Sequence, residues 1–250
     1  MTRRNTTKVD QANSSGDPSI ANDTSPCPLV NVIVAVRNGE RFLASAITSI
    51  LKQDYRPLEI IVVDGHSEDH SAAIARSFAE VRYILQTGRG IGDAYNTGIA
   101  AARGDVIAFL SHDDLWIPTK LSLQVNYLMD HPEIQYTIAM VKFFLEPGHN
   151  VPPGFKQELL RGRHVGKIME TLVARKSLFE VIGGFDDGMA LAEDADWYAR
   201  ANDQKIPMAI IPEVLLHKRV HNANASSDAQ TSNHELLKAL KRSIERKKLA

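Results

Sequence analysis

Short apolar runs alternate with amphipathic segments through the first half of the chain. Such runs are typical of strands that are buried on both faces of a sheet, and they cover residues 29–36, 58–63, 81–85 and 105–110. Apolar positions at helical spacing follow the first run, and Ser67 is placed to cap a helix after the second run, with Glu68 and Asp69 in its first turn. A glycine-rich loop, 88–92, leads into a helix that extends to about Ala102. Strands that alternate with helices predict an α/β fold with right-handed crossovers and a mostly parallel sheet.

The second half of the chain has a less regular pattern. Its residues predict, in order, a strand at 134–144, a loop at 146–166, a strand at 168–173, a short helix from Lys176 and a helix over 193–201. Trp116 and Trp197 are expected to lie in the core, because large aromatic side chains contribute most when they are buried.

The two ends of the chain differ from its middle. Residues 1–28 are rich in Ser, Thr, Asn and Asp and predict a disordered tail without the apolar centre of a secretory signal. Residues 29–232 form the predicted domain, and 233–250 predict a basic amphipathic helix with Leu236, Leu237, Leu240 and Ile244 on one face. That helix could cover the core, pair with a second subunit or lie on an anionic membrane. Packing on the core is favoured, because an apolar stripe usually faces a core.

Composition narrows the functional classes. The 250 residues are 44% hydrophobic and 24% charged, enough for one large domain or two small ones. A net charge of -1 lacks the basic footprint of nucleic-acid-binding proteins. The single Cys27 excludes an internal disulfide framework, and no apolar run reaches the roughly 20 residues that span a bilayer. We therefore expect a cytoplasmic protein, with peripheral contact to the inner face of the membrane through the terminal helix as an open alternative.

Polar segments follow three of the predicted strands, at 37–39, 64–67 and 111–114. Ligands of open parallel sheets bind beyond the carboxyl ends of the strands, so Asp64, Asp113 and Asp114 are expected to lie together there. Two carboxylates about 4 Å apart repel by roughly 4 kcal/mol at an effective dielectric constant near 20. Mg²⁺ or Mn²⁺ would relieve this repulsion. The alternative is that Asp113 and Asp114 cap the next helix and that Asp64 is a turn residue.

The glycine loop does not match a dinucleotide-binding fingerprint. The third glycine of that pattern would fall at Asp93, whose carboxylate has the wrong sign for a pyrophosphate at a helix N-terminus. A nicotinamide-dependent enzyme is therefore disfavoured.

Seven segments in the same order carry a resemblance to a known family. The chain resembles the inverting family 2 glycosyltransferases of the GT-A fold over about 30–226, through segments 32–43, 60–69, 90–100, 108–116, 181–186, 192–197 and 220–226. The resemblance implies a mostly parallel nucleotide-binding sheet, flanked by helices, with a smaller acceptor-side subregion. It also implies transfer of a sugar, with inversion, from a nucleotide-diphosphate sugar to the hydroxyl of an acceptor that the sequence does not identify.

The resemblance also implies roles for individual residues. Asp64 would hold the nucleotide base in a pocket lined by Ala35, Arg37 and Asn38. Arg89 and Asp93 would line the side of the diphosphate and donor sugar, and Asp114 and Glu193 would also contact substrate. Asp113 would bind Mg²⁺ or Mn²⁺, with His221 close to the metal or the diphosphate. Asp194 would be the catalytic base, and Glu193 is its nearest rival.

The chain departs from the family's pattern at two places. Ser111 stands where the family usually has Asp, which removes a negative charge near the metal, and Gly65-His66 replaces a more usual Asp-Gly pair. Two other functions remain open. A sugar nucleotidyltransferase would need a basic, glycine-rich loop after the first strand, which Arg37-Asn38-Gly39 matches poorly. A non-catalytic nucleotide-sugar-binding protein would be consistent with Ser111.

Overall fold

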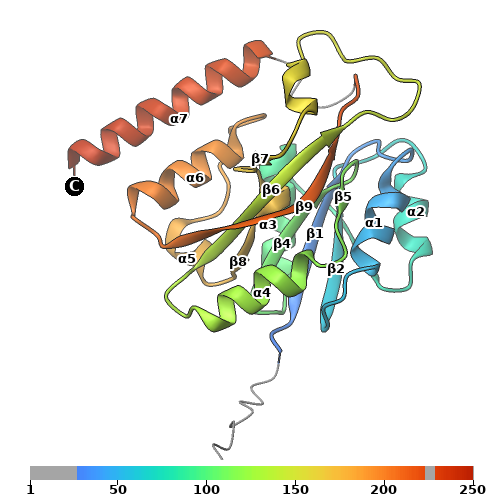
Figure 1. Cartoon of the computed structure of the whole chain (residues 1–250), viewed down its shortest axis with the longest axis horizontal. Helices are drawn as coiled ribbons and strands as arrows, with labels where there is room; N and C mark the ends of the chain where they lie inside the picture. The colour runs from blue at the N-terminus through green and yellow to red at the C-terminus, as the bar shows by residue number, and fades with distance from the viewer. Residues whose placement is uncertain (1–26, 223–228, 250) are drawn as a thin grey trace, which may run out of the picture.

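The computed structural model describes residues 27–222 and 229–249, so the predicted tail, apart from residues 27 and 28, lies outside the described part. One curled sheet forms the centre of the molecule and helices cover both of its faces (Figure 1). The strand order is β3-β2-β1-β4-β8-β6-β9-β5, with β7 paired to β6. The strands are β1 (Val30–Val36), β2 (Leu58–Asp64), β3 (Val81–Leu85), β4 (Val106–Ser111), β5 (Leu115–Trp116), β6 (Tyr136–Phe144), β7 (His164–Val165), β8 (Val173–Arg175) and β9 (Met208–Arg219).

The four strands predicted in the first half are confirmed and are parallel to one another. The central strand β1 is buried along its whole length and alternates between two cores. Its even-numbered residues, such as Val32, pack toward α1 (Leu43–Leu51) and α4 (Lys120–Asp130). Ile33 and Ala35 pack toward α3 (Gly90–Ala101) on the other face. This two-residue period explains the unbroken apolar run, because both faces of the strand are covered.

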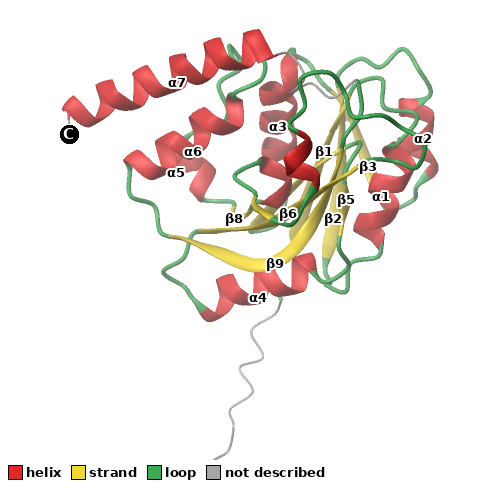
Figure 2. Cartoon of the chain, turned by 45° about the horizontal axis from the view of Figure 1, so that its top comes forward, coloured by secondary structure: helices red, strands yellow, loops and turns green. Residues whose placement is uncertain are grey.

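Helix α3 packs very closely on β1. A Cβ atom at Gly98 would lie 2.4 Å from the Ile33 side chain, so only glycine fits at this point of the helix. On the same face lie α5 (Leu178–Ile182) and α6 (Glu193–Asp203), whereas α2 (Ser71–Ser77) packs with α1 on the opposite face (Figure 2). Trp116 and Trp197 are buried, as predicted.

The second half of the sheet is mixed in direction. Strand β8 pairs antiparallel with β4 and β6, and β9 runs parallel to β6. No strand was predicted where the long β9 lies. Its register against β6 shifts around Ala139–Val141, where Pro212 and Glu213 form a bulge that interrupts the apolar pattern.

Several local predictions are wrong. Ser67 does not cap a helix, since α2 begins at Ser71 and the Ser67 hydroxyl accepts a hydrogen bond from the Asn38 N–H at 2.9 Å. Asp113 and Asp114 do not cap α4, which begins six residues after Asp114. The segment 168–173 is mainly the 3-10 helix η2 (Met169–Thr171), and the loop 146–166 contains η1 (Gln157–Leu160) and β7.

The terminal helix α7 (Ala229–Leu249) begins earlier than predicted and lies along α6 (Figure 1). Its contacts with the rest of the protein are mostly polar, whereas Leu236, Leu237, Leu240 and Ile244 are 44–57% exposed. The expectation that the leucine stripe covers the core is therefore wrong. None of the described helices is long and apolar enough to cross a membrane.

Candidate active site

The carboxyl ends of β1, β2 and β4 are level with one another. In the register of the sheet, Val36 pairs with Asp64, and Ala35 pairs with Val63 on one side and Ser111 on the other. Parallel strands bring their final residues to one edge, and the loops beyond them carry most of the predicted site residues.

Asp64 lies at the end of β2, apart from Asp113 and Asp114. Its carboxylate is buried and accepts hydrogen bonds from the Tyr83 hydroxyl and the Ser67 N–H, both at 2.8 Å. Burial, together with the hydrogen bond to Asp64, raises the pKa of Tyr83 to about 12. Because β1 lies between β2 and β4, Asp64 does not join Asp113 and Asp114 in a cluster of three carboxylates, and that expectation is wrong.

Asp113 follows β4 and contacts a histidine from the far end of the chain. The Asp113 Oδ2 lies 2.9 Å from the His221 Nε2, and the Asp113 carbonyl accepts a hydrogen bond from the Arg219 Nε at 2.8 Å. Burial by itself would raise the pKa of Asp113, but the hydrogen bond from His221 and the positive charge of Lys218 outweigh it, and the pKa falls to about 2. This carboxylate is therefore charged at neutral pH.

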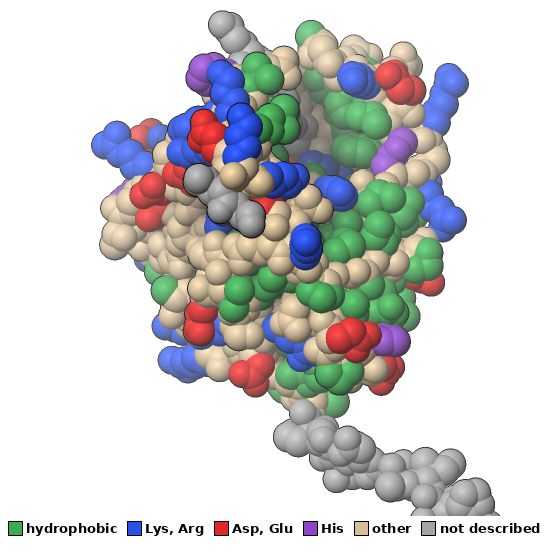
Figure 3. All heavy atoms as spheres, turned by 90° about the vertical axis from the view of Figure 1, so that its left-hand side faces the viewer, with side chains coloured by type: hydrophobic (Ala, Val, Ile, Leu, Met, Phe, Trp, Pro, Cys, Tyr) green, Lys and Arg blue, Asp and Glu red, His purple; other side chains and the backbone are tan. Residues whose placement is uncertain are grey.

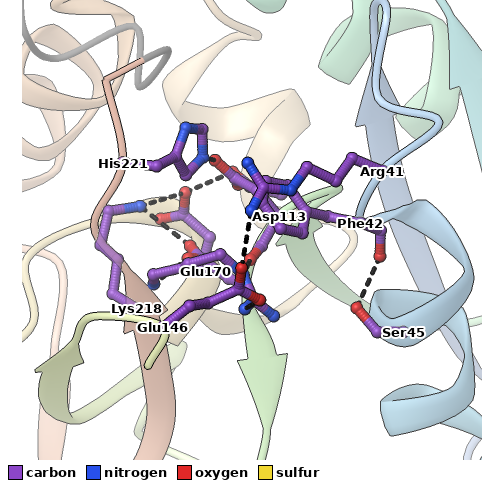
Figure 4. A network of polar contacts seen from close by, with 11 residues as sticks. Arg41, Phe42, Ser45, Asp113, Glu146, Glu170, Lys218 and His221 are labelled. Carbon is purple, nitrogen blue, oxygen red and sulfur yellow. Dashed lines mark hydrogen bonds and ion pairs between the residues drawn. The ribbon is translucent and has the colours of Figure 1, made fainter. Parts of the chain in front are cut away.

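A second group of charges lies beneath Asp113 (Figure 4). The Lys218 ammonium donates to the Asp114 Oδ2 at 2.9 Å and to the Glu170 Oε1 at 3.1 Å. The Ser111 hydroxyl donates to the same Glu170 oxygen at 2.5 Å. Asp114 is fully buried, and its other oxygen accepts a hydrogen bond from the backbone N–H of Arg219 at 2.8 Å. We call Ser111, Asp114, Glu170 and Lys218 the lysine network.

The charges of the lysine network stabilise one another. Burial would lower the pKa of Lys218, but the negative charges of Asp114 and Glu170 outweigh burial and hold that pKa well above its usual range. Burial would raise the pKa of Glu170, yet Lys218 and the Ser111 hydroxyl lower it. Lys218 therefore remains an ammonium group in contact with the charged Glu170 and with Asp114, whose pKa is raised to about 7, chiefly by burial.

Arg41, after β1, and Arg219, the last residue of β9, hold the loop after β6 against the site. Glu146 forms ion pairs with Arg219 and, at 2.9 Å, with Arg41. Both guanidinium groups lie over the Phe42 ring, at 4.5 Å for Arg219 and 4.6 Å for Arg41. The Phe42 ring also packs 5.1 Å from the His221 ring (Figure 4). These contacts fix the rim above Asp113.

Two acids begin α6. Asp194 is partly exposed, and its Oδ1 accepts the Ala195 N–H at 2.6 Å. Glu193 is buried, and its Oε2 has no hydrogen-bond partner among the described residues. Burial and the charge of Glu170 raise the pKa of Asp194 to about 6, and burial and the charge of Asp194 raise the pKa of Glu193 to about 8. The Tyr198 hydroxyl, on α6, donates to the Ile168 carbonyl at 3.1 Å, so α6 lies beside η2, which carries Glu170.

The remaining predicted residues lie on loops near the same edge. Arg37 and Asn38 are exposed just after β1, and the Asn38 Oδ1 accepts the Glu68 N–H at 2.9 Å. Arg89 is exposed at the N-terminal end of α3. Asp93 accepts the Gly88 N–H at 3.1 Å and thereby closes the glycine loop.

Asp113 and His221 provide ligand atoms that suit a divalent cation whose remaining ligands come from the substrate. Asp113 offers a charged oxygen and His221 an imidazole nitrogen, and such ions usually take one or two protein carboxylates plus phosphate oxygens. Within 27–222 and 229–249, no three His, Cys, Asp or Glu residues gather to form a site from protein ligands alone. Sequence reasoning missed Glu170, Lys218 and Arg219, because η2 and β9 were not recognised.

The structure is an α/β fold in which the parallel strands end at loops that carry Asp64 and Asp113, and α6 begins with the acids Glu193 and Asp194. The model of glycosyl transferase family 2 matches residues 31–191, and the chain belongs to that family. An uncharacterised glycosyltransferase of Rickettsia typhi is 32% identical over 223 residues, which cover 84% of this chain and 67% of the relative.

Solved structures of glycosyltransferases share the GT-A fold of this chain. TarS residues 1–349 of S. aureus, in complex with UDP-GlcNAc, superpose with a TM-score of 0.67 at 18% identity, covering 87% of this chain and 66% of that one. The mannosyltransferase PcManGT of Pyrobaculum calidifontis, in complex with GDP-Man and Mn²⁺, superposes with a TM-score of 0.68 at 23% identity. That alignment covers 88% of this chain and 65% of PcManGT. The predicted fold and family are confirmed.

Proposed function

We propose that this protein transfers a sugar from a nucleotide-diphosphate sugar to an acceptor hydroxyl in one displacement that inverts the anomeric centre. The observation that carries the proposal is that the candidate site contains two acids with different protonation behaviour. Asp113 is charged and bonded to His221 on the nucleotide side, and Asp194 has a pKa of about 6 on the opposite side. Transfer needs a charged group near the leaving diphosphate and a proton acceptor near the attacking hydroxyl.

Asp113 and His221 are the residues that would hold Mg²⁺ or Mn²⁺. The metal would supply positive charge to the leaving nucleoside diphosphate. Complexes of related folds with UDP-GlcNAc, and with GDP-Man and Mn²⁺, support this class of donor and cation. In the proposal, Lys218 acts indirectly, because its ammonium group fixes Asp114 and Glu170 beneath the metal residues.

The donor pocket extends along the strand ends. The buried Asp64 faces its partners Tyr83 and Ser67 and would accept a hydrogen bond from the nucleotide base. Ala35, Arg37 and Asn38 would line the same pocket. Arg89, within the glycine loop, and Asp93, just after it, would contact the diphosphate or the donor sugar. In this proposal, Asp114 holds β9 in place beneath the pocket, since both of its carboxylate oxygens accept hydrogen bonds from that strand.

Asp194 is the better base of the two acids at the start of α6. A base must be deprotonated at working pH and yet hold a proton well in the transition state, which favours a pKa slightly below neutral. Asp194, at about 6, meets both conditions. Glu193, at about 8, is mostly protonated at neutral pH and is more deeply buried, so it would orient the acceptor.

Replacement of each acid tests this assignment. Asp194→Asn should lower kcat by roughly 10²–10⁴-fold while nucleotide affinity stays unchanged. Asp187→Asn is the control, since Asp187 is an exposed acid on the neighbouring loop. NMR of the product should show the inverted anomer. Loss of turnover only in Glu193→Gln would assign the base to Glu193 instead of Asp194. Normal turnover in both variants would show that the base lies elsewhere. A lack of turnover by the unchanged protein that still binds nucleotide sugar would favour a non-catalytic binding protein.

The products released by the unchanged protein test the nucleotidyltransferase alternative. Release of pyrophosphate from a nucleoside triphosphate and a sugar phosphate, without release of nucleoside diphosphate from a nucleotide sugar, would support it. A cytoplasmic location stays a prediction.

A further inference from the structure

The terminal helix α7 packs on the protein through a mostly polar face, and the apolar face that its sequence predicts to be buried is exposed. Glu235, Ala239 and Ser243 are buried, and they follow one another at four-residue spacing along the face that meets α6. Ser243 donates to the Asp203 Oδ1 at 2.7 Å, and Arg246 lies 2.8 Å from the Asp203 Oδ2. Polar contacts therefore fix the orientation of this helix and turn its apolar stripe away from the protein.

The outward face combines apolar and basic side chains. Leu236, Leu237, Leu240 and Ile244 are 44–57% exposed and follow one another at helical spacing. Lys241 and Lys248 are exposed along one edge of this stripe, and Lys247 is also exposed but pairs with Asp203 at 3.2 Å. Figure 3 looks onto the C-terminal end of α7, where Lys and Arg side chains gather beside hydrophobic ones. We call Leu236, Leu237, Leu240, Lys241, Ile244 and Lys248 the outer face of α7.

Charge is concentrated on this helix. From residue 229 to residue 249 the chain has six basic and two acidic side chains. Three of the basic ones, Arg242, Arg246 and Lys247, pair with Asp186 or Asp203, whereas Lys238, Lys241 and Lys248 form no ion pair among the described residues, and Glu245 is the exposed acid on the helix. A helix with an apolar stripe flanked by lysines fits the boundary between headgroups and acyl chains of an anionic bilayer.

We propose that the outer face of α7 docks the protein on an anionic lipid surface. The leucines would enter the acyl boundary, and the lysines would remain at the level of the phosphate groups. A second copy of this chain is a poorer occupant. A two-fold pairing through the same face would bring Lys241 and Lys248 of the two copies together, with Glu245 as the one exposed acid that the described part of α7 places beside them.

The docking helix is also connected to the acceptor side of the site. The Glu235 carboxylate accepts hydrogen bonds from the N–H groups of Ala190, Leu191 and Ala192, at 2.7–3.1 Å. This loop leads directly into Glu193 and Asp194. A surface bound by α7 would therefore lie beside the acceptor side. The docking itself does not depend on the chemistry proposed for Asp194.

Co-sedimentation of the full chain with vesicles tests the proposal. The protein should bind vesicles of phosphatidylcholine with phosphatidylglycerol and should bind pure phosphatidylcholine much less. Each lysine contributes about a fivefold gain in partition near an anionic surface, so Lys241→Glu with Lys248→Glu should reduce binding by at least about 25-fold. Leu237→Gln with Ile244→Gln should reduce it about tenfold or more.

Matched controls come from exposed residues on other faces. Lys52→Glu with Lys142→Glu makes the same charge change, and Leu123→Gln, on α4, removes an exposed leucine. Both controls should bind vesicles as the unchanged protein does. All variants should keep their circular dichroism and their rate of donor hydrolysis without vesicles.

Three results would overturn the proposal. The first is equal binding to neutral and anionic vesicles, and the second is unchanged binding of the α7 variants relative to their controls. The third is a dimer, measured by light scattering without lipid, that the leucine variant converts to a monomer, since a second copy would then cover the outer face.

Discussion

The buried carboxyl of Glu193 predicts a specific dependence of stability on pH. The side chain is 7% exposed, its Oε2 lacks a hydrogen-bond partner among the described residues, and Asp194, Glu170 and Glu235 add negative charge around it. Burial and this charge raise its pKa from 4.5 to about 8 in the folded protein. Between these two values the folded state binds more protons than the unfolded state, so the free energy of unfolding should fall as pH rises.

The size of this effect follows from the two pKa values. Between about pH 5 and about pH 8, the Glu193 contribution to the free energy of unfolding should fall by on the order of 3 kcal/mol. Glu193→Gln is uncharged at every pH and removes this contribution. Relative to the unchanged protein, the variant should therefore gain stability as pH rises, by that same order.

Urea unfolding of both proteins at several pH values measures the difference directly. The subtraction removes the titration of the other groups, which both proteins share. Glu180→Gln, at an exposed position on α5, is the control, and its difference from the unchanged protein should not vary with pH. If the Glu193→Gln difference is equally flat, Glu193 is charged in the folded state and the assignment of Asp194 as the better base loses its basis.

Two further predictions concern the nucleotide side of the site. Asp113→Asn should weaken the binding of Mn²⁺ and of nucleoside diphosphate together, by about tenfold or more, while the fold is retained; unchanged calorimetric affinity for the nucleoside diphosphate with Mn²⁺ would rule out the proposed metal role. Lys218→Met leaves Asp114 and Glu170 buried without their shared cation and should cost about 3–5 kcal/mol of stability in urea unfolding. A loss below about 1 kcal/mol would show that the lysine network contributes no more than a surface ion pair.

The sequence predicted the parallel half of the sheet well, because β1, β2, β3 and β4 are short apolar runs. It did not predict β9, where the bulge at Pro212 breaks the alternation and polar side chains occupy one face. This omission limited the prediction of the site. Topology alone placed Asp113 at a strand end, but its neighbour His221 and the lysine network depend on contacts between residues 48–108 positions apart.

The packing of α7 was mispredicted for a different physical reason. An apolar stripe usually decides which face of a helix is buried. Here the buried face is set by ion pairs and hydrogen bonds of Arg242 with Asp186 and of Ser243 and Arg246 with Asp203. No local pattern shows that an acid on α6 will meet a base on α7, so the sequence could identify the amphipathic helix without revealing its orientation.

The unusual Ser111 is best understood together with its neighbours. An aspartate at this position would place a fourth carboxylate beside Asp113, Asp114 and Glu170, and Lys218 is the ammonium group that contacts Asp114 and Glu170. Serine instead donates a hydrogen bond to Glu170, whose carboxylate keeps a negative charge at this point of the site. Like charges held a few ångströms apart in a buried site repel strongly, so serine at 111 and glutamate at 170 form a compatible pair. The residue that differs from the family's usual pattern is therefore compensated within the network, and it leaves the proposed metal residues Asp113 and His221 intact.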